Sequence, residues 1–391
     1  MPRAGRRQVR REEAAGHPAV STLRHPSCTH RVMMQAAMRE ILRRLERDDP
    51  LGLGESCGVR WEAERLEERR YSSIYVLRSG AAGQCVRERL GSENLVLKVY
   101  RAAQPERRQR EFDDLCRVYD GLAQTVLTGV VRPVACFAEL GAILTACAPG
   151  EAAGPLMRRA CRRGGSAELL ARAAALCTAA ATWLRTFQKV GRERVRGQTP
   201  RHLGRAEDFL AYIDERMRIL CRQRLGVEPA LRTRILAHTA AVLNARGAAA
   251  LADVTWSHAD FGPHNLLADG DRLTVLDFEL APEHPYFDAA YFIESLAGLR
   301  GPLVDPTRVR RLERAFLSAY RAPADDPFFE LFRLRHLLCT YVSQSRLDGL
   351  ARLRAWPGLL RLRARLQRFP DALALGLRPA ATWPRLGSVE V

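Results

Sequence analysis

Two neighbouring stretches decide the fold of this chain: Trp256-Ser-His-Ala-Asp260-Phe-Gly-Pro-His-Asn265-Leu-Leu267 and Thr274-Val-Leu-Asp277-Phe-Glu279. In the first stretch an apolar strand delivers a His-x-Asp unit, and an asparagine follows five residues after the aspartate. An Asp-Gly turn joins the two stretches, which is typical of a β-hairpin. Because a hairpin returns the chain to the same edge, we expect Asp260, Asn265 and Asp277 to converge.

The acidic side chains of this region indicate a site for a divalent cation. Residues 251–300 hold nine acids against two arginines, inside a chain whose net charge is +18. Carboxylates that repel one another need a reason to cluster, and carboxylate and amide oxygens suit Mg²⁺. We therefore expect Asn265 and Asp277 to bind Mg²⁺, and Asp260 to act as the base for a substrate hydroxyl.

Four further polar residues of the region have expected roles around the hairpin. His258 is expected to brace the loop by hydrogen bonding, and Asp288 to hold nearby backbone in place. Since Mg²⁺ prefers oxygen ligands, His264 is interpreted as an exposed loop histidine. Glu279 fits either a supporting carboxylate or a substrate contact.

The lysine count points to a second component of the site. The chain has two lysines, Lys98 and Lys189, beside sixty arginines. Lys98 lies in the apolar run 95–100, where a charge is costly unless it is paired. A compact ammonium group and a planar guanidinium are not interchangeable at a phosphate. We therefore expect Lys98 to bind nucleotide phosphates with Glu111 as its partner; the alternative is an edge-strand lysine that points to water.

Phosphoryl transfer requires this set of parts. The reaction needs positioning and charge neutralisation, from a lysine on the phosphates, a carboxylate that holds it, a metal pair and a base. The sequence has no Gly-x-Gly-x-x-Gly phosphate loop, and Ser72 and Ser73 are expected to cover the phosphates instead. The backbone of Ala146 and Ala148 is expected to bind the adenine edge; a bare connecting strand is the alternative.

The chain divides into a β-rich part and a helical part. Residues 1–50 are Arg-rich, and we expect a partly disordered extension with one helix at 32–47. Residues 51–147 predict a small antiparallel-sheet lobe that binds the nucleotide. Residues 148–391 predict a larger, mainly helical lobe that contains the catalytic hairpin 254–279. The expected fold class is therefore α+β with two lobes.

The strands of the first lobe are predicted from runs of β-branched and aromatic residues. Residues 71–77 and 94–100 predict a hairpin through a Gly-containing connection at 78–91. Residues 107–122 predict a helix with one apolar face. Two short apolar runs are expected to pair with each other, at 130–137 and 142–147.

The motif order resembles the aminoglycoside phosphotransferase and choline kinase-like family, whose fold is bilobal and protein-kinase-like. The resemblance rests on Asp260-x4-Asn265, on Leu276-Asp-Phe-Glu279 and on Pro285-Tyr-Phe-Asp-Ala-Ala-Tyr291, and covers roughly residues 66–340. It implies an ATP- and Mg²⁺-dependent phosphotransferase that acts on a hydroxyl of a sugar, an amino alcohol or an aminoglycoside-like molecule. Ala259 replaces the family's usual glycine, which is tolerable where φ is not positive.

Composition limits the remaining classes of protein. Forty-seven per cent hydrophobic residues exclude wholesale disorder. The longest uncharged stretch before Lys189 is residues 173–184, shorter than the ~20 residues that span a bilayer. Without an apolar signal core or a Cys-x-x-Cys pair, we expect a cytoplasmic protein with reduced thiols. The Arg-rich ends predict weak contact with an anionic surface, and no specific nucleic acid is expected.

Two other functions are compatible with the same fold. The first is a kinase-fold nucleotide-binding protein without significant turnover, although the intact Lys98, Asp260, Asn265 and Asp277 argue against it. The second is a basic nucleic-acid- or membrane-binding module that uses a kinase-like core as a scaffold. It predicts salt-dependent binding through residues 1–50 or 328–368.

Overall fold

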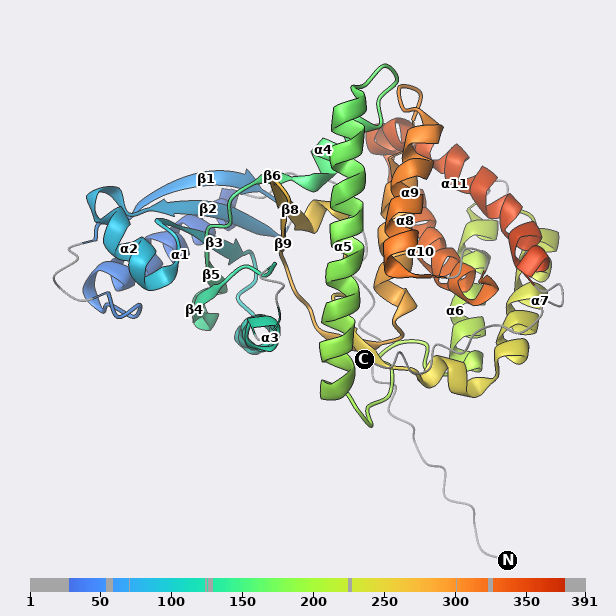
Figure 1. The fold of residues 1–391 in the computed structure, drawn as a ribbon, viewed down its shortest axis with the longest axis horizontal. Coiled ribbons are helices and arrows are strands. Elements are labelled where there is room, and N and C mark those ends of the chain that lie inside the picture. The colour runs from blue at the N-terminus through green and yellow to red at the C-terminus, as the bar shows by residue number, and fades with distance from the viewer. Residues whose placement is uncertain are drawn as a thin grey trace, which may run out of the picture.

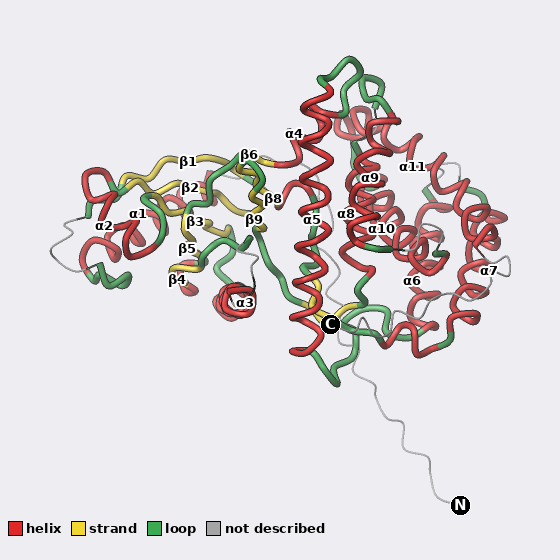
Figure 2. Tube along the Cα trace, viewed as in Figure 1, coloured by secondary structure: helices red, strands yellow, loops and turns green. Residues whose placement is uncertain are grey.

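The computed structural model has two lobes, one built around a β-sheet and one built of helices (Figure 1). The tube coloured by secondary structure shows that strands gather in the first lobe and that helices fill the second (Figure 2). The structure describes residues 28–53, 59–69, 71–123, 125, 129–223, 227–299, 301–322 and 326–376. The expected disorder of the N-terminal extension falls on residues 1–27, which lie outside these ranges.

The first lobe, hereafter the N lobe, contains a five-stranded antiparallel sheet in the order β1-β2-β3-β5-β4. The paired runs predicted at 130–137 and 142–147 are β4 and β5, which pair in antiparallel register. In β3 the even-numbered side chains face away from the core, and the odd-numbered ones are buried in it, as half-buried strands require. The strands are β1 (Glu62–Glu68), β2 (Ser72–Arg78), β3 (Asn94–Tyr100), β4 (Pro133–Phe137) and β5 (Ala142–Ala146).

Helix α1 (Cys28–Arg47) belongs to the N lobe rather than to an extension. Its side chains Met34, Ile41 and Leu45 are buried in one hydrophobic cluster with the strands of the sheet. A helix that buries an apolar stripe against a sheet is part of that domain's core. The N lobe therefore begins within the segment 1–50 that was interpreted as an Arg-rich extension.

Two elements of the N lobe differ from expectation. The connection 78–91 is not a simple loop, because it contains the 3-10 helix η2 (Gly80–Ala82) and helix α2 (Gly83–Leu90). Helix α2 ends at Gly91, whose φ of 78° is a common left-handed helix cap. Strand β1 was missed because its sequence Glu-Ala-Glu-Arg-Leu-Glu-Glu is mostly charged and exposed.

A large helical lobe, the C lobe, follows β5 and carries two small sheets. In one sheet β8 (Leu266–Asp269) pairs with β6 (Glu151–Ala152) and with β9 (Arg272–Val275), which confirms the predicted hairpin. In the other, β7 (Thr255–Ser257) pairs with β10 (Ala281–Glu283). Residues 254–279, on which the sequence predicts catalytic side chains, are hereafter the catalytic segment. The segment has strands in both small sheets, because β7 pairs with β10 and β9 pairs with β8.

The helices of the described C lobe surround a single hydrophobic cluster. Those predicted from Ala-rich segments are α5, α6 and α7. The α-helices of the C lobe are α4 (Ala153–Ala160), α5 (Ala167–Arg194), α6 (Ala206–Arg222), α7 (Pro229–Arg246), α8 (Tyr286–Gly298), α9 (Pro306–Tyr320), α10 (Pro327–Ser345) and α11 (Gly349–Gly376). Its 3-10 helices are η4 (Ala248–Ala252) and η5 (Pro263–Asn265). Helix α3 (Pro105–Ala123) and the 3-10 helix η3 (Ala138–Leu140) lie in the N lobe.

Helix α5 is the central helix of the C lobe. By length and composition alone it could cross a membrane, but its Trp183 and Phe187 are buried in the hydrophobic cluster. The Trp183 ring stacks on Phe261 of the catalytic segment, with centroids 5.6 Å apart. Gly191 leaves room for Trp256, which a side chain at this position would overlap. Helix α5 is therefore the core helix that supports the catalytic segment.

The cysteines are mostly unpaired in the described part of the chain. Cys161 and Cys177 are buried free thiols, and burial raises the pKa of Cys161 to about 11. Cys85 is disulfide-bonded, so the expectation of reduced thiols is wrong at this residue.

Candidate functional site

His258 is buried beneath the loop that carries Asp260 and stabilises it through hydrogen bonds, as expected. His258 Nε2 is 2.7 Å from the Leu276 carbonyl oxygen, and the Asp260 N–H donates to His258 Nδ1 at 3.3 Å. Burial lowers the pKa of His258, so the ring is neutral and donates through Nε2. A neutral, buried histidine with both nitrogens engaged holds the two halves of the hairpin together.

Asp288 of α8 fixes the backbone just before Asp260. It accepts hydrogen bonds from the His258 N–H at 2.7 Å, the Ala259 N–H at 3.1 Å and Ser257 Oγ at 2.9 Å. Burial raises the pKa of Asp288, and the hydrogen bonds from these three donors lower it. The effect of burial is larger, and the pKa is about 7. The expectation that Asp288 holds loop backbone agrees with this geometry.

Two non-glycine residues of the site have left-handed backbone conformations. The φ angle is 65° at Ala259 and 56° at Asp277. The left-handed region costs an ordinary residue about 1–2 kcal/mol. Ala259 therefore does need the conformation for which glycine is suited. Such strain persists only where the surroundings hold it, and it clusters at functional sites.

Asp260 lies at the mouth of the loop with its carboxylate about half exposed. Asn265 Nδ2 donates to Asp260 Oδ2 at 3.0 Å, and His264 Nε2 lies 3.1 Å from the same oxygen. Burial by itself raises the pKa of Asp260, but hydrogen bonds from His264 and Tyr291 outweigh it and lower the pKa to about 2. Asp260 is therefore an oriented, ionised carboxylate at neutral pH.

Asn265 and Asp277 lie at the same end of the β8–β9 hairpin. The Leu276 N–H donates to the Asn265 carbonyl at 2.9 Å, which places Asp277 next to Asn265 in the ladder. The Asn265 amide nitrogen is bound to Asp260, so the amide oxygen is left for another ligand. An amide oxygen and a carboxylate on one edge fit the oxygen preference of Mg²⁺.

Lys98 of β3 joins the two lobes at this edge. Lys98 Nζ donates to Asp277 Oδ1 at 2.8 Å and lies 3.6 Å from Glu111 Oε1 of α3. Glu111 is held in turn by Arg108 at 2.6 Å and by the Tyr100 hydroxyl. Burial on its own lowers the pKa of Lys98, but the charges of Asp277 and Glu111 outweigh it and raise the pKa. The predicted Lys98–Glu111 pair is thus present in the structure, and the edge-strand alternative does not hold.

Arg69 is a residue of the site that the sequence analysis missed. It directly follows β1, and its N–H donates to the Ser72 carbonyl at 2.8 Å across the β1–β2 turn. Its guanidinium donates to Asp277 Oδ2 at 3.2 Å, while Arg101 Nη2 donates to its carbonyl at 2.9 Å. Burial raises the pKa of Asp277, but Lys98 and Arg69 outweigh burial and lower it.

The structure separates the two serines that were predicted to cover the phosphates. Ser72 pairs with Tyr100 and therefore lies on the face of the sheet that carries Lys98. Ser73 pairs with Val99, is buried, and its hydroxyl lies 3.6 Å from Met34 Sδ of α1. A phosphate contact by the Ser73 hydroxyl is contradicted because the strand register directs it into the core.

Ala146 and Ala148 of the connection between the lobes were predicted to bind the adenine edge, and the N–H of Ala146 is already hydrogen-bonded within the protein. The Ala146 N–H donates to the Arg132 carbonyl at 2.9 Å, and the Cys147 N–H donates to the Asn94 carbonyl at 2.9 Å. These amides are therefore unavailable for a nucleotide base. Ala148, the other predicted residue, lies directly after them on the segment that enters β6.

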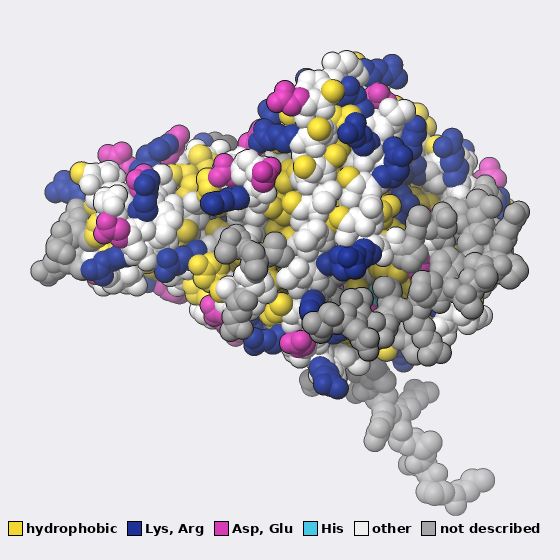
Figure 3. Space-filling model, in the orientation of Figure 1, with side chains coloured by type: hydrophobic (Ala, Val, Ile, Leu, Met, Phe, Trp, Pro, Cys, Tyr) yellow, Lys and Arg dark blue, Asp and Glu magenta, His cyan; other side chains and the backbone are white. Residues whose placement is uncertain are grey.

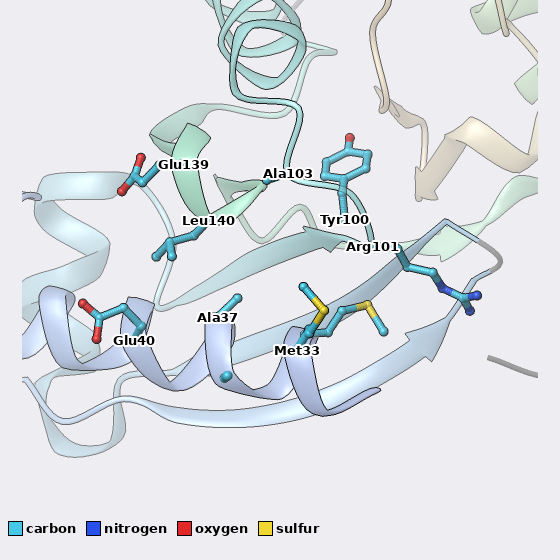
Figure 4. A pocket seen from close by; sticks show the side chains of 10 residues that line it. Met33, Ala37, Glu40, Tyr100, Arg101, Ala103, Glu139 and Leu140 are labelled. Carbon is cyan, nitrogen blue, oxygen red and sulfur yellow. The ribbon is translucent and has the colours of Figure 1, made fainter. Parts of the chain in front are cut away.

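A groove of about 410 Å³ lies on the N lobe between α1 and the end of β3 (Figure 4). It is lined mainly by Met33, Met34 and Leu140, together with Tyr100. Its acids are paired with arginines of α1, as in the Glu139–Arg44 contact. The groove lacks the convergent carboxylates of the Asp260 edge and is distinct from it.

A tyrosine and a buried arginine lie behind Asp260, on α8 and α10. Tyr291 hydrogen-bonds Asp260, and its ring contacts His336 with centroids 5.2 Å apart. The adjacent Arg335 is buried and stacks over Phe287 at 4.3 Å. Among the described residues, Arg335 Nε has no hydrogen-bond partner. No described carboxylate lies within ion-pair distance of the Arg335 guanidinium.

A family of enzymes has this combination of sequence and geometry. The model of the phosphotransferase enzyme family matches residues 74–326, which is more than half of the chain and includes Lys98, Asp260, Asn265 and Asp277. The chain belongs to this family. Phosphotransferase activity on hydroxyl acceptors follows from that membership, and the predicted resemblance is confirmed. No curated protein matches the chain in sequence.

Solved structures of phosphotransferases share the fold. A putative aminoglycoside phosphotransferase from Ralstonia eutropha is 14% identical, with a TM-score of 0.53 over 87% of this chain and 98% of that one. A choline kinase from Cryptosporidium parvum is 12% identical, with a TM-score of 0.51 over the same shares.

A third similar structure is a thermostable mutant of the aminoglycoside phosphotransferase APH(4)-Ia in complex with AMP-PNP and hygromycin B. It is 16% identical, with a TM-score of 0.51 over 87% of this chain and 99% of that one. These likenesses confirm the expected bilobal, protein-kinase-like fold.

Proposed function

We propose that this phosphotransferase uses ATP and Mg²⁺ and transfers the γ-phosphoryl group to a hydroxyl of a small molecule. The observation that carries the proposal is the 2.8 Å contact between Lys98 of the N lobe and Asp277 of the C lobe. A phosphate-binding cation and a metal-binding carboxylate meet at the lobe boundary, beside the oriented carboxylate of Asp260. The AMP-PNP bound by the APH(4)-Ia mutant supports ATP as the nucleotide.

Lys98 has the properties of a phosphate ligand. It is a compact cation on a strand, and its charge is maintained by Asp277 and Glu111. Glu111 cannot swing away freely, because Arg108 and Tyr100 also hold it. A preorganised cation stabilises the negative charge of the transferring group without reorganisation during the reaction. Arg69 adds a second cation at the same edge.

Asn265 and Asp277 are the residues that would hold Mg²⁺. The free amide oxygen of Asn265 and the carboxylate of Asp277 supply two oxygen ligands, and Mg²⁺ commonly takes the rest from phosphates and water. The ion supplies charge neutralisation on the phosphates. The described residues contain no cluster of three or more His, Cys, Asp or Glu side chains suited to a metal. This fits a site that the nucleotide completes.

Asp260 is the group that would receive the acceptor's proton. Its carboxylate is half exposed and ionised, and it is oriented by Asn265 and His264, which both contact Oδ2. His258 is excluded as the base because both of its ring nitrogens are engaged in the buried brace. A positioned general base contributes roughly 10²–10⁴-fold to a rate.

We propose Ala148 as the residue whose amide binds the adenine edge, because the N–H groups of Ala146 and Cys147 already donate hydrogen bonds to carbonyl groups of the protein.

The charge of the residues behind Asp260 favours some acceptors over others among sugars, amino alcohols and aminoglycosides. The buried Arg335, whose charge no described carboxylate neutralises within ion-pair distance, would repel a polycation and attract an anionic group. This favours an acidic or neutral sugar over an aminoglycoside-like acceptor.

The test is ADP release with a panel of sugars, sugar acids, amino alcohols and aminoglycosides, for the wild type and for Asp260→Asn. We expect at least one acceptor to stimulate ADP release by the wild type, and Asp260→Asn to lose about 10²- to 10⁴-fold in kcat while it still binds ATP. The matched control is Asp271→Asn, at the exposed tip of the same hairpin. An Asp260→Asn enzyme that turns over like the wild type would overturn the assignment of the base.

A further inference from the structure

Helix α11 has an apolar stripe on its outer face as well as one on its inner face. The inner stripe is Leu359, Leu362, Leu366 and Phe369, all buried against the C lobe. The outer stripe is Leu350, Leu353, Trp356 and Leu360, whose exposed fractions lie between 45% and 72%. Both follow the three- and four-residue spacing of a helix face. The outer stripe is therefore an organised surface rather than scattered apolar residues.

Arginines border the outer stripe on both sides. Residues 349–370 contain six arginines and no acid. By helical spacing, Arg354 and Arg361 lie along one border and Arg352 and Arg363 along the other. In the described part of the chain, no carboxylate lies within ion-pair distance of Arg354 or Arg361. Arg354 and Arg361, which are both exposed, therefore present uncompensated positive charge beside the apolar side chains.

The position of α11 leaves this face accessible. The helix forms an outer side of the C lobe, away from the β-sheet of the N lobe (Figure 1). Arginine side chains gather over the part of the C lobe where α9 and α11 lie (Figure 3). The fold uses the inner stripe of α11, together with Arg365, which pairs with Glu294 of α8.

We propose that the outer face of α11 binds the surface of an anionic lipid bilayer. The four apolar side chains would enter the boundary between headgroups and acyl chains, and the bordering arginines would contact the anionic headgroups. This inference is independent of the phosphotransfer reaction and concerns a surface that the reaction does not use.

Other partners fit the same face less well. Nucleic acid would use the arginines but would leave four apolar side chains without a partner. A second copy of the chain, joined through the same face by a two-fold axis, would bring the arginine borders of both copies together. An anionic bilayer satisfies both the apolar and the charged components.

The test is flotation of the full chain with vesicles of phosphatidylcholine, and with vesicles in which one third of the lipid is phosphatidylglycerol. We expect at least about tenfold more binding to the anionic vesicles, and loss of that excess at high salt. Leu353→Ser with Leu360→Ser should reduce binding to anionic vesicles about tenfold. The matched control is Leu303→Ser, an equally exposed leucine outside α11, which should leave binding unchanged.

A second variant tests the charged borders without altering the apolar stripe. Arg354→Gln with Arg361→Gln should reduce binding to anionic vesicles about tenfold and leave binding to phosphatidylcholine unchanged. Equal wild-type binding to both vesicles would overturn the proposal, as would stripe variants that bind like the wild type. Sedimentation that shows a dimer lost in the stripe variants would instead assign the face to contact between copies.

Discussion

Lys98 Nζ lies 2.8 Å from Asp277 Oδ1, although the two residues are 179 positions apart in the chain. One residue belongs to the N-lobe sheet and the other follows the C-lobe hairpin, so the contact defines how the lobes meet. It also brings Arg69 and Glu111 to the same edge. Lys98 and Asp277 therefore each have two partners of opposite charge.

Replacement of Lys98 by methionine should reduce kcat/KM for ATP by about 10²- to 10³-fold. The change removes a preorganised cation from the transferring phosphates and leaves Asp277 with Arg69 as its remaining cation. Steady-state kinetics with the best acceptor would measure the loss. Lys189→Met, which removes the other, exposed lysine, is the control and should behave as the wild type. Equal kinetics of the two variants would contradict a role for Lys98 on the phosphates.

The acid limb of the pH–rate profile should move upward when His264 is replaced by glutamine. Asp260 has a pKa of about 2, because its hydrogen bonds with His264 and Tyr291 outweigh the effect of burial. The native carboxylate is therefore ionised at all higher pH values, and loss of the His264 donor raises its pKa. We expect the limb to shift toward about pH 4, the ordinary range of an aspartate.

The lowered pKa of Asp260 should also make the folded chain less stable at acid pH. The pKa of Asp260 is lower in the folded chain than the ordinary ~3.9 of an unfolded one. Its contribution to stability is therefore present above that value and is lost as the pH falls toward about 2. Rates and unfolding midpoints measured together would separate the two effects. An acid limb at the same pH in the wild type and in His264→Gln would contradict the account of His264.

Ala259→Gly should leave the protein as stable as the wild type or stabilise it by up to about 1 kcal/mol. Glycine relieves the left-handed strain at φ 65°, which costs about 1–2 kcal/mol, and part of this gain is lost to the greater entropy of the unfolded chain. Ala175→Gly, at an exposed position of α5, should instead destabilise by about 1 kcal/mol. Chemical unfolding would measure both; equal destabilisation by the two variants would show that Ala259 is unstrained.

Ile41→Ala should destabilise the N lobe by about 2–5 kcal/mol, because Ile41 of α1 is completely buried against the sheet. Val32→Ala on the exposed face of the same helix should change stability by less than about 0.5 kcal/mol. Unfolding by urea, followed by fluorescence, would give both values. Similar small changes at the two positions would place α1 outside the folded lobe.

The components of the site that were predictable from the sequence are those that one local segment brings together. Asp260, Asn265 and Asp277 lie within eighteen residues, and the hairpin pairing places them at one end by local geometry alone. Lys98 was predictable for a different reason. A charge in an apolar strand needs a partner, and Asp277 supplies one across the lobe boundary.

The components that were not predictable depend on contacts between distant segments. Arg69 reaches Asp277 through the β1–β2 turn, and nothing in its surrounding sequence distinguishes it from many other arginines. Tyr291 reaches Asp260 from α8. Ser73 was assigned incorrectly because its direction depends on the register of β2, where a shift of one residue exchanges the two faces.

The most direct test of the central claim is thermal unfolding with ATP, GTP or ADP, with and without Mg²⁺, for the wild type and for Asp277→Ala. A ligand that binds only the folded chain stabilises it, by about 2.7 kcal/mol at a hundredfold excess over Kd. We predict that Mg²⁺ and ATP together raise the wild-type midpoint by several degrees, and that Asp277→Ala abolishes the part that requires Mg²⁺. A midpoint that no nucleotide raises, or a rise that needs neither Mg²⁺ nor Asp277, would contradict the proposed nucleotide site.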